Sequence, residues 1–184
     1  QQRFGFFVSP QSLPAFVAFL DKVFSAEDKK QTCEVELLKG KTASRWAQIE
    51  AVYDDVHETC RAVVVDVTER KHAEEALHMT RFSVENSADA IYWMTAEGRV
   101  ADVNENACRV LGYTRDELVN SFVWESDPQW DAESWRNHFA ELRQRGTLRF
   151  EGNQRHRDGQ LIPVEIVANH LKFGEKEFNC AIVR

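Results

Sequence analysis

The sequence predicts a protein of the α+β class, in which a helix followed by a three-stranded antiparallel meander occurs twice. The first observation is an imperfect repeat, because the alternating apolar and polar residues of 33–51 resemble those of 150–167. In each copy two such runs flank a polar turn, at 39–41 and at 157–159, and a third run follows. The second observation is that further strand and short-helix patterns precede only the later copy. A repeat of this kind defines the architectural unit.

Composition narrows the functional classes. The chain has 184 residues, 43% hydrophobic and 29% charged, enough for one or two modest cores. No apolar run approaches the roughly 20 residues of a membrane span, so we expect no direct membrane contact. The net charge of −7 argues against nucleic acid as a partner. Four isolated cysteines indicate reduced thiols and a cytoplasmic location. The chain begins inside a repeat, so we expect a fragment of a larger parent, and a membrane anchor elsewhere in that parent is compatible with this.

The first copy and the segment after it are defined by apolar spacing and capping residues. Helical spacing predicts a helix over 12–24, and three strands follow it. Asp66, with Glu69 three residues later, matches a capping box, and Thr68 is a second N-cap candidate. A helix is therefore predicted over 68–86.

The second copy is predicted to contain five strands and three helices. The predicted strands span residues 90–95, 99–104, 147–156, 160–171 and 177–184. The predicted helices span residues 105–111, 114–119 and 132–145. Thr114 and Glu117 match a second capping box, and Gly112 and Gly146 supply helix ends.

Three sequence motifs carry a resemblance to a known family. Residues 97–113 read E-G-R-V-x-x-V-N-x-x-A-C-x-x-L-G-Y, residues 155–165 read R-x-x-D-G-x-x-I-P-V-E, and residues 66–71 read D-V-T-E-R-K. The first two resemble the first hairpin with its helix, and the central hairpin, of PAS domains. The third resembles the junction through which many PAS domains continue into the next helix.

The resemblance implies both an architecture and a domain organisation. It implies the PAS fold, a five-stranded antiparallel sheet with helices on one face. Residues 87–184 then form a nearly complete second PAS domain. Residues 68–86 form a signalling helix, and residues 1–67 form the C-terminal part of a first PAS domain.

The resemblance also implies a function in signal transduction. PAS domains act as sensors, so we expect a sensory module of a multidomain protein such as a sensor histidine kinase or a diguanylate cyclase. A change caused by a ligand or partner would pass through the junction formed by Asp66, Thr68, Glu69 and Arg70. Arg70 is in reach of Asp66 and is expected to pair with it. The rival interpretation is a structural dimerisation module without a ligand.

Motifs for catalysis and metal binding are missing from the sequence. There is no G-x-S-x-G, no Walker loop, no H-E-x-x-H and no G-x-G-x-x-G. The six histidines never occur four residues apart in a predicted helix. We therefore expect no catalytic residues, no enzymatic activity of this fragment and no metal site.

The cofactors known in the family can be considered residue by residue. In flavin-binding PAS domains the adduct-forming cysteine corresponds to about Val123. Their flavin-binding asparagines correspond to Gln154 and Val164, so we expect no flavin. In haem-binding PAS domains the place of the ligand corresponds to about Trp135. His138 lies one turn further on, and we interpret it as a core histidine and not as a haem ligand. We predict no cofactor.

A candidate pocket is expected between the sheet and the helices of the second copy. Its expected wall contains Tyr92, Met94, Asn104, Trp124, Trp135, His138, Phe139, Val164 and Ile166. Whether Tyr92 or Trp93 points inward stays open, since both phases of this strand are apolar. A filled or nearly filled core is slightly favoured, and any ligand is expected to be small and apolar.

Two apolar surfaces predict a homodimer. Ala73, Leu77 and Val84 form a thin seam near heptad spacing on the predicted linker helix. The outward residues of the strand 160–171 are also fairly apolar. Self-association is expected through the linker helix or the outer face of the sheet.

Overall fold

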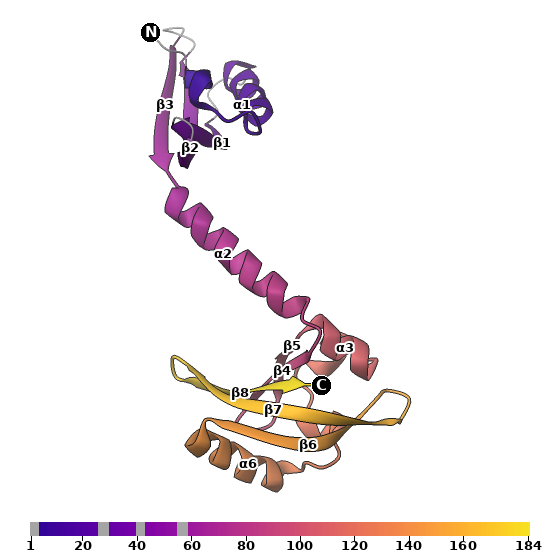
Figure 1. Cartoon of the computed structure of the whole chain (residues 1–184). Helices are drawn as coiled ribbons and strands as arrows, with labels where there is room; N and C mark the ends of the chain where they lie inside the picture. Colours follow the sequence, from indigo (N-terminus) through magenta and orange to yellow (C-terminus); the bar gives the residue numbers. More distant parts are fainter. Residues whose placement is uncertain (1–3, 26–29, 40–42, 55–58) are drawn as a thin grey trace. The chain divides into compact units, whose positions relative to one another are not determined.

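The computed structural model describes residues 4–25, 30–39, 43–54 and 59–184, and it divides into two compact units, Gln1–His78 and Met79–Arg184. Helices and strands occur in both units (Figure 1). The predicted α+β class is confirmed. The predicted domain bounds at 67 and 86 stay a prediction, and the division between the two units falls within helix α2, Thr68–Glu85.

The first unit is a three-stranded antiparallel sheet with one helix against it. The short helix η1, Phe4–Phe7, precedes helix α1, Leu13–Ser25. The strands are β1, Gln31–Lys39, β2, Ala43–Asp54, and β3, Thr59–Asp66, in the sheet order β1-β2-β3. The core consists of Val8, Phe16, Phe19, Val23, Val35, Ala47, Ile49 and Ala51. The turn expected at 39–41 falls largely outside the described residues.

Strand β3 has the sequence of a central strand but lies at an edge of its sheet. Its whole length is exposed, including the consecutive Val63, Val64 and Val65. Val64 pairs with the buried Ile49 of β2, so it lies on the same face as α1 without being covered by it. A run that is apolar on both faces is typical of strands buried on both sides. The first unit therefore leaves uncovered apolar surface at β3.

The second unit contains a five-stranded antiparallel sheet, as predicted. Its strands are β4, Ala90–Thr95, β5, Val100–Val103, β6, Thr147–Arg155, β7, Leu161–Phe173, and β8, Lys176–Val183. Its helices are α3, Glu105–Leu111, α4, Arg115–Leu118, α5, Val123–Ser126, and α6, Ala132–Arg145. The sheet order is β5-β4-β8-β7-β6, so the first hairpin pairs with the last strand.

Local sequence signals account for the helix ends of the second unit. Thr114 and Glu117 form the predicted capping box, with both reciprocal hydrogen bonds present. Gly112 ends α3 in the left-handed region at φ 75°, where a side chain would be strained. Asp131 caps α6 by accepting hydrogen bonds from the backbone N–H groups of Glu133 and Ser134. These caps set where α3, α4 and α6 begin or end.

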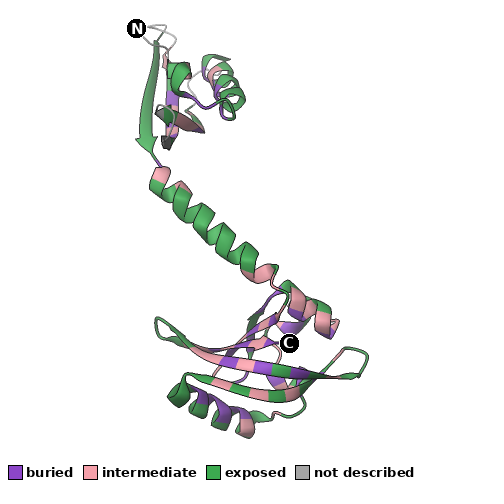
Figure 2. Ribbon diagram, viewed as in Figure 1, coloured by how far each residue is buried: buried purple, intermediate pink, exposed green. Residues whose placement is uncertain are grey.

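The core of the second unit lies between the sheet and its helices. Every second residue of β4 is buried, and the buried residues of α6 are Trp135, His138, Phe139 and Leu142. The buried side of α6 is turned toward the sheet (Figure 2). Tyr92 is buried and Trp93 is only half-buried, which settles the open question of this strand's phase.

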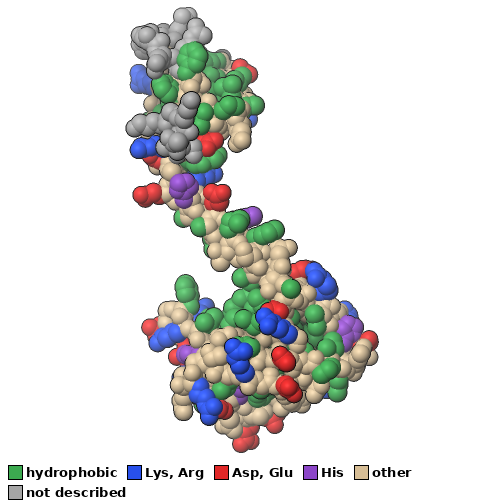
Figure 3. Space-filling view, in the orientation of Figure 1, with side chains coloured by type: hydrophobic (Ala, Val, Ile, Leu, Met, Phe, Trp, Pro, Cys, Tyr) green, Lys and Arg blue, Asp and Glu red, His purple; other side chains and the backbone are tan. Residues whose placement is uncertain are grey.

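Helix α2 has no buried residue along its eighteen positions. Leu77, Met79 and Phe82 are exposed on it, and Figure 3 shows hydrophobic side chains at its surface. Within the second unit, Glu85 at its end pairs with Arg115 of α4 at 2.6 Å. Among the described residues, no helix is both long enough and apolar enough to cross a membrane.

Candidate functional site

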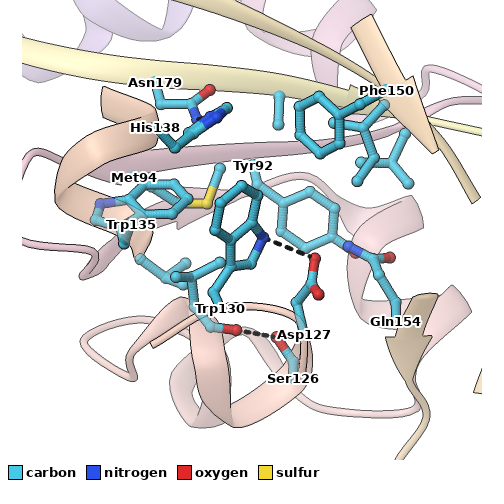
Figure 4. Close-up of a pocket in the computed structure, with 15 residues that line it drawn as sticks. Tyr92, Met94, Ser126, Asp127, Trp130, Trp135, His138, Phe150, Gln154 and Asn179 are labelled. Atoms are coloured by element: carbon cyan, nitrogen blue, oxygen red, sulfur yellow. Dashed lines mark hydrogen bonds between the residues drawn. The ribbon is translucent and has the colours of Figure 1, made fainter. Parts of the chain in front are cut away.

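The second unit encloses a small cavity between its sheet and helices α5 and α6 (Figure 4). Its volume is about 30 Å³, more than the roughly 10–15 Å³ that a single water molecule needs. Tyr92 and Met94 line it from β4, and Trp135 and His138 line it from α6. The other lining residues are Val100, Val123, Ser126, Asp127, Trp130, Phe150, Gln154, Ile166, Asn179, Ala181 and Val183. Side chains therefore fill most of this interior.

One end of the cavity is formed by Asn179 and His138. Asn179 follows the inward phase of β8 together with Ala181 and Val183, and it is only 1% exposed. Its Nδ2 lies 3.2 Å from Nε2 of His138, and because an amide nitrogen only donates, the ring nitrogen accepts. Within the described part of the chain, Oδ1 of Asn179 is buried without a hydrogen-bond partner. Burial lowers the pKa of His138, which favours its neutral ring.

A buried carboxylate lies elsewhere in the cavity wall. Asp127, at the C-terminal end of α5, is 3% exposed. It accepts hydrogen bonds from the backbone N–H and the Nε2 of Gln129, at 3.3 and 3.2 Å, and from Nε1 of Trp130 at 3.2 Å. Burial raises the pKa of this carboxyl group, because the charged form is poorly solvated there. Nearby, the hydroxyl of Tyr92 donates to Oε1 of Gln154 at 3.2 Å.

Aromatic rings pack edge to face around the cavity. Trp130 lies perpendicular to Trp135, with ring centroids 5.6 Å apart, and nearly perpendicular to Phe150 at 5.8 Å. The ring of Trp130 also lies 4.6 Å from that of His138. Such arrangements add modest stability beyond the buried area. The cavity is thus a small gap inside an aromatic core, with a few polar groups in its wall.

This sheet order and helix arrangement belong to a known fold. Residues 89–184 match the family model described as a PAS domain, which is more than half of the chain. The chain belongs to the PAS domain family. Comparison with curated proteins gives no match.

Solved PAS structures resemble the chain over most of their own length. The PAS domain of an HTR-like protein from Haloarcula marismortui is 29% identical, with a TM-score of 0.60, and the match covers 63% of this chain and 96% of that one. A domain of a sensory box sensor histidine kinase/response regulator from Geobacter sulfurreducens is 28% identical, with a TM-score of 0.51, covering 61% and 96%. The PAS domain of a two-component sensor histidine kinase is 23% identical, with a TM-score of 0.53, covering 61% and 97%, and shows the fold alone.

The structure brings five of the nine expected pocket residues together in the PAS cavity. Those five are Tyr92, Met94, Trp135, His138 and Ile166. The other four do not line it. Val164 and Phe139 lie in the surrounding core, and Trp124 stacks on Phe122 with ring centroids 4.5 Å apart.

Asn104, the fourth, is fully buried and serves the backbone of the PAS fold. Its Oδ1 accepts from the backbone N–H groups of Ile91 and Ala107, each at 3.0 Å. Its Nδ2 donates to the carbonyls of Val84 and Asp89, at 3.1 and 3.0 Å. With its donors and acceptor engaged, Asn104 ties α3 to β4 and to the end of α2 and offers nothing to a ligand.

Sequence reasoning did not place Asp127, Trp130 or Asn179 in the pocket wall. Asp127 precedes a proline in a loop, and nothing local marks it as buried. Asn179 could have been found, because it shares the inward phase of an otherwise apolar strand with Ala181 and Val183. A polar residue in that phase is a candidate for a site.

The junction residues lie together at the end of β3 and the start of α2, within the first unit. Oδ1 of Asp66 accepts from the backbone N–H of Thr68 at 2.9 Å. The hydroxyl of Thr68 accepts from the backbone N–H of Trp46 in β2, also at 2.9 Å. Hydrogen bonding to the side chain and to the backbone N–H of Thr68 holds the pKa of Asp66 below its usual range. Together with the Trp46 bond it fastens the first turn of α2 to two strands.

The ion pairs of the junction differ from the expected Asp66–Arg70 pair. Arg70 instead contacts Glu34 of β1 and Glu74 of α2, the latter at 2.7 Å. Asp66 lies 3.4 Å from Arg45 of β2. The expectation rested on sequence proximity, whereas sheet register places other charges nearer. Glu69 is exposed in the first turn of α2 and makes no capping contact with Asp66, whose partner is Thr68.

Proposed function

We propose that the chain is a sensory module of a signalling protein, in which residues 87–184 form the sensing PAS domain. PAS domains typically act as sensory modules and not as catalysts. The observation that carries the proposal is a cavity inside the PAS core into whose wall Asn179 brings an Oδ1 that has no partner among the described residues. A solved relative, 28% identical, belongs to a sensor histidine kinase/response regulator. A histidine kinase or a diguanylate cyclase is the output that we propose for the parent.

We also propose that residues 1–67 are the C-terminal part of a first PAS domain. Helix α1 is followed by the antiparallel order β1-β2-β3, and helix α6 is followed by β6, β7 and β8 in the same meander. The central-strand character of β3 supports the proposal. Its counterpart in the second unit, β8, is a central strand that pairs with β4 on one side and with β7 on the other. Residues 68–86 would be the signalling helix.

The proposed route of the signal is from a strand into a helix. In the first unit, the hydrogen bonds of Asp66 and Thr68 tie β2 and β3 to the first turn of α2. In the second unit, β8 carries Asn179 into the cavity, and Arg184 after it pairs with Asp89, just before β4, at 2.9 Å. A change in the sheet would shift the balance between two arrangements of the adjoining helix.

The experiment that tests this route uses Asp66→Ala, with Asp21→Ala on the exposed side of α1 as the matched control. We expect faster amide hydrogen exchange in the first turn of α2, because its anchor is lost, while far-UV circular dichroism stays native. The same substitution in the full-length parent should alter output with little change in ligand binding. Unchanged output from a folded Asp66→Ala protein would show that this junction does not transmit the signal.

A second function, dimerisation, is favoured by the exposure of α2. Leu77 is 71% exposed and none of the helix is buried, although most helical stability in proteins comes from packing of an apolar face. We propose a homodimer through α2 or through the outer face of the five-stranded sheet. A purely structural module without a ligand is the alternative form of this proposal.

The remaining parts of the proposal concern location and chemistry. We propose a cytoplasmic location for this segment and no catalysis by it. A cavity of about 30 Å³ would have to expand many times to hold a flavin or a haem, which supports a module without either cofactor. Among the described residues, no cluster of three or more His, Cys, Asp or Glu could hold a metal ion.

A further inference from the structure

The wall of the PAS cavity offers hydrogen-bond acceptors and a negative charge, but no positive side chain. None of its lining residues is Lys or Arg. Oδ1 of Asn179 has no partner in the described part of the chain. The carboxylate of Asp127 is held only by neutral N–H donors, those of Gln129 and Trp130. An unpaired acceptor and an uncompensated buried carboxylate are both unfavourable, and a positively charged donor in the cavity would pair with the acceptor and offset part of the buried charge.

The aromatic rings around the cavity suit the same kind of ligand. Trp130, Trp135, Tyr92 and Phe150 all line it. Faces of aromatic rings attract cations, most strongly those of tryptophan. The other titratable groups in the wall do not oppose a cation, because burial favours the neutral forms of both His138 and Tyr92.

Two other classes of ligand fit less well. An anionic ligand would face Asp127 without any Lys or Arg in the wall to pair with it. An apolar ligand, the class that the sequence led us to expect for any ligand, would leave Oδ1 of Asn179 without a partner among the described residues. The volume of about 30 Å³ limits the polar head of the ligand to a small group.

We propose that this cavity binds a small protonated primary amine, whose ammonium group donates to Asn179 and whose charge offsets that of Asp127 in the same wall. The inference rests on the proposed sensory function and names the class of ligand for that site. The ammonium group supplies up to three donors and one positive charge, and a body of one or two carbons contacts the rings.

The test uses the intact 184-residue chain and a series of simple probes. Ammonium, methylammonium and ethylammonium chlorides are titrated by calorimetry and by tryptophan fluorescence, at constant ionic strength with sodium chloride. Ethanol is the uncharged counterpart of ethylammonium. We expect saturable binding of at least one ammonium probe and a rise of the melting temperature with its concentration. We expect ethanol to bind at least about tenfold more weakly, since charge-assisted hydrogen bonds are the stronger ones.

Two substitutions identify the groups responsible. Asp127→Asn removes the charge with little change of shape, and Asn179→Leu removes the acceptor. Each should weaken binding by about tenfold or more, which corresponds to one charge-assisted contact. Asp116→Asn on the exposed α4 is the matched control and should bind as the wild type does.

Several outcomes would overturn the proposal without touching the sensory function. Equal binding of ethanol and ethylammonium would show that the site does not distinguish a charged ligand from a neutral one. This comparison uses only the wild-type protein, so it does not depend on whether a variant folds. Wild-type affinity in folded Asp127→Asn and Asn179→Leu would place the site elsewhere. An absence of saturable binding of every ammonium probe to the wild type would refute the ligand class. The sensory function is tested separately, by whether Asn179→Leu and Asp66→Ala alter the output of the full-length parent.

Discussion

Replacing Trp135 by Ala tests how fully the core of the PAS domain is packed. Trp135 is 2% exposed, and its ring packs against Trp130 and His138, with centroids 5.6 and 5.4 Å apart. Its Nε1 donates to the carbonyl of Thr95 at 3.2 Å. That carbonyl also accepts from the backbone N–H of Gly98 at 3.0 Å, so the substitution does not leave it unpaired. The expected loss of stability on substitution therefore comes chiefly from lost packing.

The expected magnitude follows from the size of the void. Truncating a buried tryptophan to alanine typically costs about 3–5 kcal/mol. The free energy of unfolding of a domain is about 5–15 kcal/mol, so the loss is a large fraction of it. For a domain of this size, about 1 kcal/mol shifts the melting temperature by roughly 4–8 °C, which gives a fall of about 12–40 °C.

The assay is urea unfolding followed by circular dichroism, with hydrogen exchange of β4, β7 and β8 to assign the loss to the second unit. Phe173→Ala, at a side chain 83% exposed, is the matched control and should change stability by about 0.5 kcal/mol or less. Added indole should restore part of the melting temperature of Trp135→Ala by filling the void. A folded Trp135→Ala protein that loses less than about 1 kcal/mol would refute the packed-core reasoning.

Two further predictions concern protonation and self-association. Burial lowers the pKa of His138 below its usual 6.5, so the unfolded chain takes up this proton at a higher pH than the folded chain does. The free energy of unfolding should therefore fall as the pH drops below about 6.5. The urea midpoint of His138→Asn should decline less over this window, and equal declines would contradict the assignment. Light scattering at high micromolar concentration should show a dimer for the wild type and a monomer for Leu77→Lys, with His72→Lys on the same helix as the control. A wild-type monomer would instead favour intramolecular use of α2.

Several parts of this fold could be predicted because they depend on local interactions. The capping box of Thr114 and Glu117 needs only residues three apart, and it forms as predicted. Gly112 ends α3 because only glycine adopts its backbone angles without strain. Alternation along β7 and β8 predicted both strands, since side chains on a strand point to opposite faces in turn.

The phase of β4 and the partners of charged residues could not be predicted in the same way. Both phases of β4 are apolar, so the choice of Tyr92 over Trp93 for the interior depends on pairing with β8. Arg70 is four residues from Asp66 in sequence, yet the register of the first sheet brings Glu34 to it. Such choices are made by contacts between segments that are distant in sequence.

The sequence by itself determined the α+β class, the order of the helices and strands, and the PAS family, because periodicity and caps are encoded within a few residues. The tertiary structure decided the character of the cavity. Asn179 of β8 meets His138 of α6 only when the helix packs on the sheet. Asp127 becomes buried only when α5 and the loop after it pack on the sheet, so a buried carboxylate and an amide oxygen without a partner among the described residues share one cavity wall only through packing between distant segments.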